Sequence, residues 1–236
     1  MSRYAAILFD LDDTLLDFGR CETAAFAEAH AAAGLGCAAE EAHRAYRVIN
    51  LDLWERYRLG EITPEEVRVQ RFHLLLTQFD GDPGRAAEMA ELYIDSLGRQ
   101  CHMVEGCLPL LGSLHRRIPL GLVTNGFRNV QRRRIALAGL ERYFDVVVTS
   151  EEAGAAKPSP LPFRMALASL IGLQGPVLYV GDSPDADVEG ALAAGLEACW
   201  LAPTELAYPA QLTPPTFRVP SLADLQLRLG ELLEVV

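Results

Sequence analysis

Five short apolar segments, each ending at polar or glycine-rich residues, constrain the fold of this 236-residue chain more than any other feature. Each is apolar throughout, as expected of a strand buried on both faces of a parallel sheet. Helical patterns at 130–138, 161–171 and 188–194 lie between the later segments. Strands that alternate with helices predict a doubly wound, Rossmann-like α/β fold with a parallel sheet. The five segments are 4–9, 120–123, 146–148, 177–180 and 198–201.

Residues 18–98 separate the first apolar segment from the others and contain no strand pattern. The string TPEE at 63–66 is typical of a helix start, with threonine as N-cap, proline at the first position and glutamate at the third. We therefore predict an α-helical domain at 18–98, inserted into an α/β core made of 1–17 and 99–236. The expected helices of the insert are 22–33, 40–59, 64–79 and 85–97, and one more at 222–233 ends the core.

Composition excludes several classes of partner. The net charge of -11 and the pI of about 4.9 disfavour a nucleic-acid polymer, because such binding requires a basic face. No segment approaches the roughly 18 consecutive apolar residues of a membrane span. The five cysteines include no CxxC pair, which favours reduced thiols over a disulfide framework or a zinc site. Because no signal peptide precedes the first segment, we expect the protein in the cytoplasm. We also expect a monomer or homodimer, without a membrane partner.

The first apolar segment ends in three acids, Asp10, Asp12 and Asp13. Ligands of open α/β sheets gather beyond the carboxyl ends of the strands, which is where Asp10 falls. Crowded carboxylates repel one another unless a cation joins them, and oxygen ligands favour Mg²⁺. Asp10 and Asp12 share one face of an extended chain, whereas Asp13 points elsewhere. A strand followed by an ordinary acidic turn is the alternative interpretation.

Three further segments carry residues suited to binding phosphate or metal. Thr124 and Asn125 follow one apolar segment, and the Thr124 hydroxyl with neighbouring N–H groups suits a phosphate. Lys157 has the charge to neutralise carboxylate and phosphate together. Asp182 ends another apolar segment as a candidate metal ligand, with Asp187 as one that acts through water or a neighbouring group. The alternatives are an ordinary strand–turn–helix junction, a solvated lysine and an acidic helix start.

The chain resembles the haloacid dehalogenase superfamily of aspartate-nucleophile phosphatases. The resemblance lies in four motifs that occur in this order over residues 10–187, namely DxDxT, a strand-end Thr-Asn-Gly, Lys-Pro and GDxxxxD. The resemblance implies a Rossmann-like core and, for the insert, a helical cap of the C1 type. The strings FDLDDTLLDF, VTNGF and SEEAGAAKP are similar to the pyrimidine 5′-nucleotidase-like branch. The true dehalogenases lack an acid at the position of Asp12, so its presence resembles the phosphatase and phosphomutase branches.

The resemblance also implies roles for the matching residues. Asp10 is expected to attack phosphorus and form an aspartyl-phosphate. Asp12 is expected to protonate the leaving oxygen and then to deprotonate the attacking water. Mg²⁺ is expected to be bound by Asp10, the backbone carbonyl of Asp12 and Asp182, with Asp187 in an indirect role. The transferring oxygens are expected to be held by Thr124, the Asn125 backbone and Lys157.

The implied reaction is Mg²⁺-dependent hydrolysis of a phosphomonoester, and a nucleoside 5′-monophosphate is the expected substrate. Other esters remain open, namely phosphoglycolate, sugar phosphates, acylneuraminate 9-phosphate and FMN. A phosphomutase, in which a sugar bisphosphate replaces water, is a second alternative. A non-enzymatic phosphoacceptor module like a receiver domain is a third, but the chain is about twice as long and carries a helical insert.

Overall fold

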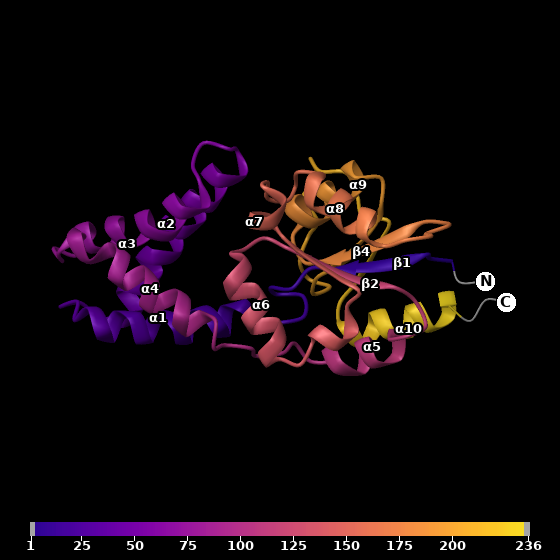
Figure 1. Cartoon of the computed structure of the whole chain (residues 1–236), viewed down its shortest axis with the longest axis horizontal. Coiled ribbons are helices and arrows are strands. Elements are labelled where there is room, and N and C mark those ends of the chain that lie inside the picture. Colours follow the sequence, from indigo (N-terminus) through magenta and orange to yellow (C-terminus); the bar gives the residue numbers. More distant parts are fainter. Residues whose placement is uncertain (1–2, 234–236) are drawn as a thin grey trace. The chain divides into compact units, whose positions relative to one another are not determined.

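The structure, a computed structural model, describes residues 3–233. The chain forms two compact units, each of which is described by itself (Figure 1). The core unit takes in Met1–Asp17, Met103–Gly126 and Ala138–Val236. The helical unit takes in Phe18–His102 and also Phe127–Leu137, a segment remote from the rest of that unit in the sequence.

One parallel sheet organises the core unit, and its strands are β1 (Ala6–Phe9), β2 (Leu120–Thr124), β3 (Val146–Thr149), β4 (Val177–Gly181), β5 (Glu197–Leu201) and β6 (Phe217–Val219). Their order is β3-β2-β1-β4-β5-β6, and every neighbouring pair is parallel. The predicted α/β fold with a parallel sheet is confirmed. The sixth strand was not predicted, because it is a three-residue edge strand within a proline-rich stretch.

Helices cover both faces of this sheet, and they are α5 (Cys107–Leu114), α7 (Ser150–Ala153), α8 (Leu161–Ser169), α9 (Gly190–Ala193) and α10 (Leu222–Leu233). Helices α8 and α9 lie on one face and α5 and α10 on the other (Figure 1). The expected helix at 188–194 is divided into a π-helix, η3 (Pro184–Glu189), and α9. Helix α5 was not predicted, because Pro109 and Gly112 interrupt its helical pattern.

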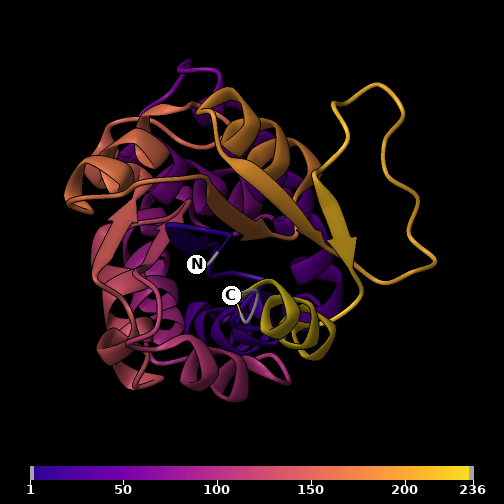
Figure 2. The same ribbon diagram turned by 90° about the vertical axis from the view of Figure 1, so that its right-hand side faces the viewer.

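Aromatic side chains pack against the neighbouring strands β4 and β5. Phe163 of α8 contacts Tyr179 of β4 edge-on, with ring centroids 4.9 Å apart. A long loop joins β5 to β6 and extends away from the sheet (Figure 2). Within this loop, Tyr208 contacts the buried Trp200 of β5, again edge-on at 4.9 Å. These contacts fix the positions of β4 and β5, and Asp182 directly follows β4.

The helical unit has an aromatic core, and its elements are α1 (Phe18–Ala33), α2 (Ala39–Arg58), α3 (Pro64–Gln78), the 3₁₀ turn η1 (Pro83–Arg85), α4 (Ala86–Leu97) and α6 (Arg128–Leu137). The ring of Tyr46 lies 5.5 Å from that of Phe72 and 5.4 Å from that of Tyr93. Arg133 of α6 pairs with Asp95 of α4 at 2.7 Å, which joins α6 to the earlier helices. Within residues 3–233, no helix is long and apolar enough to span a bilayer.

The helix start predicted at 63–66 provides a test of stability. Thr63 Oγ1 accepts a hydrogen bond from the Glu66 backbone N–H at 3.2 Å, and the Glu66 carboxylate accepts one from the Thr63 N–H at 2.7 Å. Thr63→Ala removes the first bond and should lower the free energy of unfolding by about 1 kcal/mol. Urea unfolding followed by circular dichroism measures this loss. Thr77→Ala, which removes only an exposed bond to the His73 carbonyl, is the control, and an equal loss there would contradict the capping role.

Candidate active site

Most of the residues predicted to carry the chemistry meet at one edge of the sheet. Asp10 directly follows β1, Thr124 ends β2, and Asp182 directly follows β4. Strand β1 pairs with β2 on one side and β4 on the other, so these three strand ends lie side by side. This is the edge of a parallel sheet where ligands bind. Lys157 reaches the same place from the chain between α7 and α8.

Three carboxylates form the acidic part of the site. Asp10, Asp182 and Asp187 each offer one oxygen within 4.8 Å of the others. Asp10 is 6% exposed and Asp187 only 1%, so water screens their charges poorly. Thr14 Oγ1 lies 3.4 Å from Asp182 Oδ1 and donates to it. The chain therefore gathers acids that are up to 177 residues apart into one small volume.

Asp12 lies outside this group of carboxylates. Its side chain is partly exposed, whereas Asp10, two residues earlier, is buried. The turn that follows brings Asp12 into a β-bridge with Leu16, and the exposed Asp13 takes a left-handed conformation with φ of 56°. The first two acids therefore have different surroundings, and such a difference allows two carboxylates to take different chemical roles.

Lys157 is the cation of the site. Its ammonium donates to Asp10 Oδ1 and to Asp187 Oδ1, each at 2.6 Å, and to Tyr179 Oη at 2.9 Å. Only 2% of the lysine is exposed. These three bonds use all of the donors that a lysine has. The ammonium is therefore held in one place between two carboxylates.

Burial and mutual repulsion alter the acidity of these groups. Burial raises the pKa of Asp10 to about 7, although Lys157 opposes that rise. Burial also raises the pKa of Asp182 to about 9, and the negative charges of Asp187 and Asp10 add to the effect. Burial disfavours the charge of Lys157, but Asp10 and Asp187 outweigh it, so the pKa of the lysine is raised. The ionised forms of Asp10 and Asp182 are therefore costly unless a further cation joins them.

This excess of negative charge bears on whether a metal ion fits. Three carboxylates face a single lysine, so the charge of the group is not balanced by the lysine alone. All three potential ligand atoms are carboxylate oxygens, which are hard donors suited to Mg²⁺. The residues present therefore fit Mg²⁺, with Asp10 and Asp182 as the carboxylates best placed to bind it.

Asp187 is committed to contacts within the protein. Its Oδ1 accepts from Lys157, and its Oδ2 accepts from the Ser183 backbone N–H at 2.9 Å. Gly181 makes room for it, because a Cβ at that position would lie 2.4 Å from Asp187 Cγ. Asp187 thus orients Lys157 and the Ser183 turn. These contacts agree with an indirect part in metal binding.

Asn125 joins two segments of the site through its side chain. Its Nδ2 donates to the Lys157 carbonyl at 3.1 Å, and its Oδ1 accepts from the Lys157 N–H at 2.8 Å. From the sequence, a role was predicted only for the Asn125 backbone. The reciprocal pair fixes the backbone of Lys157 beside the end of β2. Gly126 N–H also donates to Ser150 Oγ at 3.0 Å and ties the same turn to α7.

Two aromatic residues support the site and were missed by sequence reasoning. Tyr179 Oη accepts from Lys157 and donates to the Val123 carbonyl at 2.9 Å. Trp200 Nε1 donates to the Asp182 carbonyl at 2.7 Å. One feature of the sequence could have indicated them: each is an aromatic residue with a polar O–H or N–H group within a mostly apolar strand. Such residues usually find a hydrogen-bond partner when buried.

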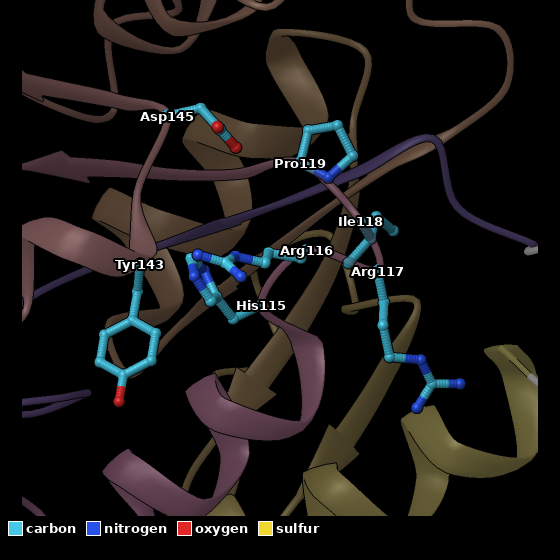
Figure 3. Close-up of a pocket in the computed structure, with 7 residues that line it drawn as sticks. All are labelled: His115, Arg116, Arg117, Ile118, Pro119, Tyr143 and Asp145. Atoms are coloured by element: carbon cyan, nitrogen blue, oxygen red, sulfur yellow. The ribbon is translucent and has the colours of Figure 1, made fainter.

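A separate pocket of about 280 Å³ lies in the core unit, just before the amino end of β2 (Figure 3). None of the predicted site residues lines it. Because it precedes β2, it lies away from the carboxyl ends of the strands and takes no part in the site. Its lining residues are His115, Arg116, Arg117, Ile118, Pro119, Tyr143 and Asp145.

Comparisons with known proteins identify the family of this chain. A family model described as haloacid dehalogenase-like hydrolase matches residues 4–195. The pyrimidine 5′-nucleotidase YjjG of Escherichia coli is 34% identical over 182 residues, which cover 77% of this chain and 79% of that protein. The pyrimidine 5′-nucleotidase PynA of Streptococcus pneumoniae is 34% identical over 225 residues, which cover 94% and 93% of the two chains.

A crystal structure supports the same relationship. The HAD-hydrolase YfnB of Bacillus subtilis, bound to magnesium, superposes with a TM-score of 0.86 at 29% identity. The match covers 97% of this chain and 99% of that one. The predicted family resemblance is therefore confirmed. The chain belongs to the haloacid dehalogenase-like hydrolases, and within that family it is an enzyme of the phosphatase type.

Proposed function

We propose that this enzyme hydrolyses nucleoside 5′-monophosphates, preferentially those of pyrimidines, with Mg²⁺ as cofactor. The observation that carries the proposal is the buried Asp10, held by Lys157 beside Asp182, with a second acid two residues along the chain. The similarity to YjjG and PynA, both named as pyrimidine 5′-nucleotidases, supports the choice of substrate class. The magnesium in the YfnB structure supports the choice of metal.

In the proposed mechanism, Asp10 is the nucleophile. Lys157 binds Oδ1 and so leaves Oδ2 to attack phosphorus, which forms an aspartyl-phosphate as the bond to the leaving oxygen breaks. When bound, Mg²⁺ supplies positive charge that keeps the acids ionised and offsets the charge of the phosphate. Lys157, whose donors are used by Asp10, Asp187 and Tyr179, is proposed to stabilise through its charge the negative charge that develops on the transferring oxygens.

Asp12 is the proposed acid and base. It donates a proton to the leaving oxygen in the first step and removes one from water in the second. The water oxygen then attacks phosphorus, the bond to Asp10 breaks, and phosphate is released. The partial exposure of Asp12 agrees with exchange of this proton with solvent.

The remaining residues position these groups. Thr124, at the end of β2, offers its hydroxyl to a phosphate oxygen, and the Asn125 backbone N–H offers a second donor. The Asn125 side chain keeps Lys157 in register with both. The insert 18–98 is proposed to act as a C1-type cap that limits the access of water to the aspartyl-phosphate. We place the enzyme in the cytoplasm, because its five free cysteines suit a reducing compartment.

A phosphate-release panel with Mg²⁺ tests the substrate class. It compares dUMP, dTMP, UMP, dAMP and GMP with phosphoglycolate, sugar phosphates, acylneuraminate 9-phosphate and FMN. The highest kcat/KM is expected for the pyrimidine monophosphates. A higher kcat/KM for sugar phosphates or FMN would retain the reaction and reject this substrate. Release that requires an added sugar bisphosphate would indicate a phosphomutase instead.

Substitution of the nucleophile tests the chemistry. Asp10→Asn should lower kcat roughly 10⁴-fold or more, since the covalent route is lost. Asp12→Asn should lower kcat about 10²- to 10⁴-fold, because it removes a general acid and base. Asp13→Asn is the matched control, since Asp13 is exposed and asparagine tolerates its left-handed backbone. Comparable losses in the control and in Asp10→Asn would contradict the assignment.

The acidity of the carboxylates predicts a pH-dependent affinity for the metal. With pKa values of about 7 for Asp10 and about 9 for Asp182 in the metal-free protein, both acids are largely protonated near pH 6. Mg²⁺ must displace these protons, so its apparent affinity should rise with pH, by up to about tenfold per unit for each proton released. Calorimetric titration between about pH 6 and about pH 9 measures this trend. An affinity independent of pH would contradict Asp10 and Asp182 as the ligands.

A further inference from the structure

Arg71, in helix α3 of the helical unit, is a buried cation without a counter-ion. Only 3% of the residue is exposed, and within residues 3–233 no carboxylate forms an ion pair with it. Its Nε donates to the Arg68 carbonyl at 3.3 Å. Its Nη1 donates to Tyr46 Oη and to Asn50 Oδ1, each at 3.1 Å. All three acceptors are neutral, although buried charges are ordinarily paired.

The second terminal nitrogen of this arginine is unsatisfied. Nη2 of Arg71 is buried and has no hydrogen-bond partner among the described residues. A buried donor without an acceptor is costly, and a charged one more so. A guanidinium has no lone pair to offer and cannot lose its charge at physiological pH. An acceptor on a bound ligand would satisfy this nitrogen.

Aromatic rings surround the guanidinium. The distances from Arg71 Cζ to the ring centroids are 4.7 Å for Tyr93, 5.2 Å for Phe72, 5.7 Å for Phe127 and 5.9 Å for Tyr46. Such contacts stabilise a cation and leave its donors available. Phe127 is only partly buried, and it contacts a second partly buried ring, Trp54, at 5.8 Å. The planes of these two rings are inclined by 47°, and together they offer an apolar aromatic surface beside the charged group.

Asn50 adds a second donor in the same place. Because arginine only donates, the amide of Asn50 must turn its oxygen toward Arg71, and its Nδ2 therefore points away from it. Within the described part of the chain, Nδ2 donates no hydrogen bond. The Asn50 amide is thus fixed as a donor for another group. Together, Arg71 and Asn50 present N–H groups beside an aromatic surface.

We infer that Arg71 and Asn50 bind the pyrimidine base of the substrate, by donating to its ring carbonyl oxygens while Phe127 and Trp54 contact its face. This inference rests on the proposed nucleotidase function. Phe127 follows Thr124, a residue proposed to bind the phosphate, by three positions in the sequence. Every pyrimidine base has a carbonyl at C2, whereas adenine has none. The donors therefore favour pyrimidines over adenine.

The ratio of kcat/KM for dUMP to that for dAMP tests this role, because the two substrates differ only in the base. Arg71→Met should lower the ratio about 10- to 100-fold, as expected for the loss of a hydrogen bond from a charged donor. Arg71→Lys keeps the charge but not the planar fork, and it should also lower the ratio. Folded Arg71 variants that keep the wild-type ratio within about twofold would overturn the inference.

Arg68→Met is the matched control. Arg68 lies one turn earlier in α3 and pairs at the surface with Glu65 and Glu91. Its substitution leaves in place the backbone carbonyl that accepts from Arg71, so the ratio should not change. An equal fall of the ratio in this control would assign the effect to the general charge of the helix and would also overturn the inference.

A measurement on the wild-type protein does not depend on the folding of any variant. In ¹⁵N spectra, saturating deoxyuridine should shift the Arg71 side-chain resonance, and deoxyadenosine at the same concentration should not. Identical spectra with and without deoxyuridine would reject the base contact. If dUMP is hydrolysed but the Arg71 results are negative, only this inference fails. If no nucleotide is hydrolysed, the proposed function fails, whatever the spectra show.

Discussion

The two hydrogen bonds from Lys157 to Asp10 and Asp187 hold together the segments that form the candidate active site of the core unit. The residues they join are 147 and 30 positions apart, so the bonds connect the end of β1, the segment before α8 and the turn after β4. Removal of one partner from a buried ion pair typically costs about 3–5 kcal/mol, because the other charge remains buried. The order of the candidate site therefore depends on this lysine.

Several otherwise unrelated features serve that arrangement. The Asn125 side chain fixes the lysine backbone, and Tyr179 accepts the third ammonium proton. Glycine at position 181 leaves space for Asp187 against the end of β4. Trp200 holds the carbonyl of the adjoining Asp182. Each contact is modest alone, but together they hold a cluster of like charges that would otherwise separate.

The two units treat buried charge in opposite ways. In the core unit, burial raises the pKa values of Asp10 and Asp182, the neighbouring acids add to the effect, and the acids outnumber the one lysine among them, so the site attracts cations. In the helical unit, Arg71 lies among aromatic rings and neutral acceptors, and one of its terminal nitrogens is unsatisfied. The first arrangement suits a metal and a reacting phosphate, and the second suits the planar base that we infer for the substrate. This division agrees with a family in which one reaction serves many substrates.

The sequence by itself determined the parallel sheet, and its patterns and motifs predicted the helical insert and the candidate site residues. Continuous apolar runs mark buried strands, and the capping string at 63–66 marks the start of α3, because these signals are local. Asp10, Thr124 and Asp182 were predictable for the same reason, since each stands at the end of such a run.

Only the tertiary structure decided what these residues contact. The hydrogen bonds of Asn125 with Lys157 and of Trp200 with Asp182 join residues that are distant in the chain. The unsatisfied nitrogen of Arg71 likewise follows from how separate helices pack around it. Strand β6 and the place of α6 within the helical unit also depend on long-range pairing. Local periodicity carries no record of such contacts, because they arise only when separate elements pack together and bury the same polar groups.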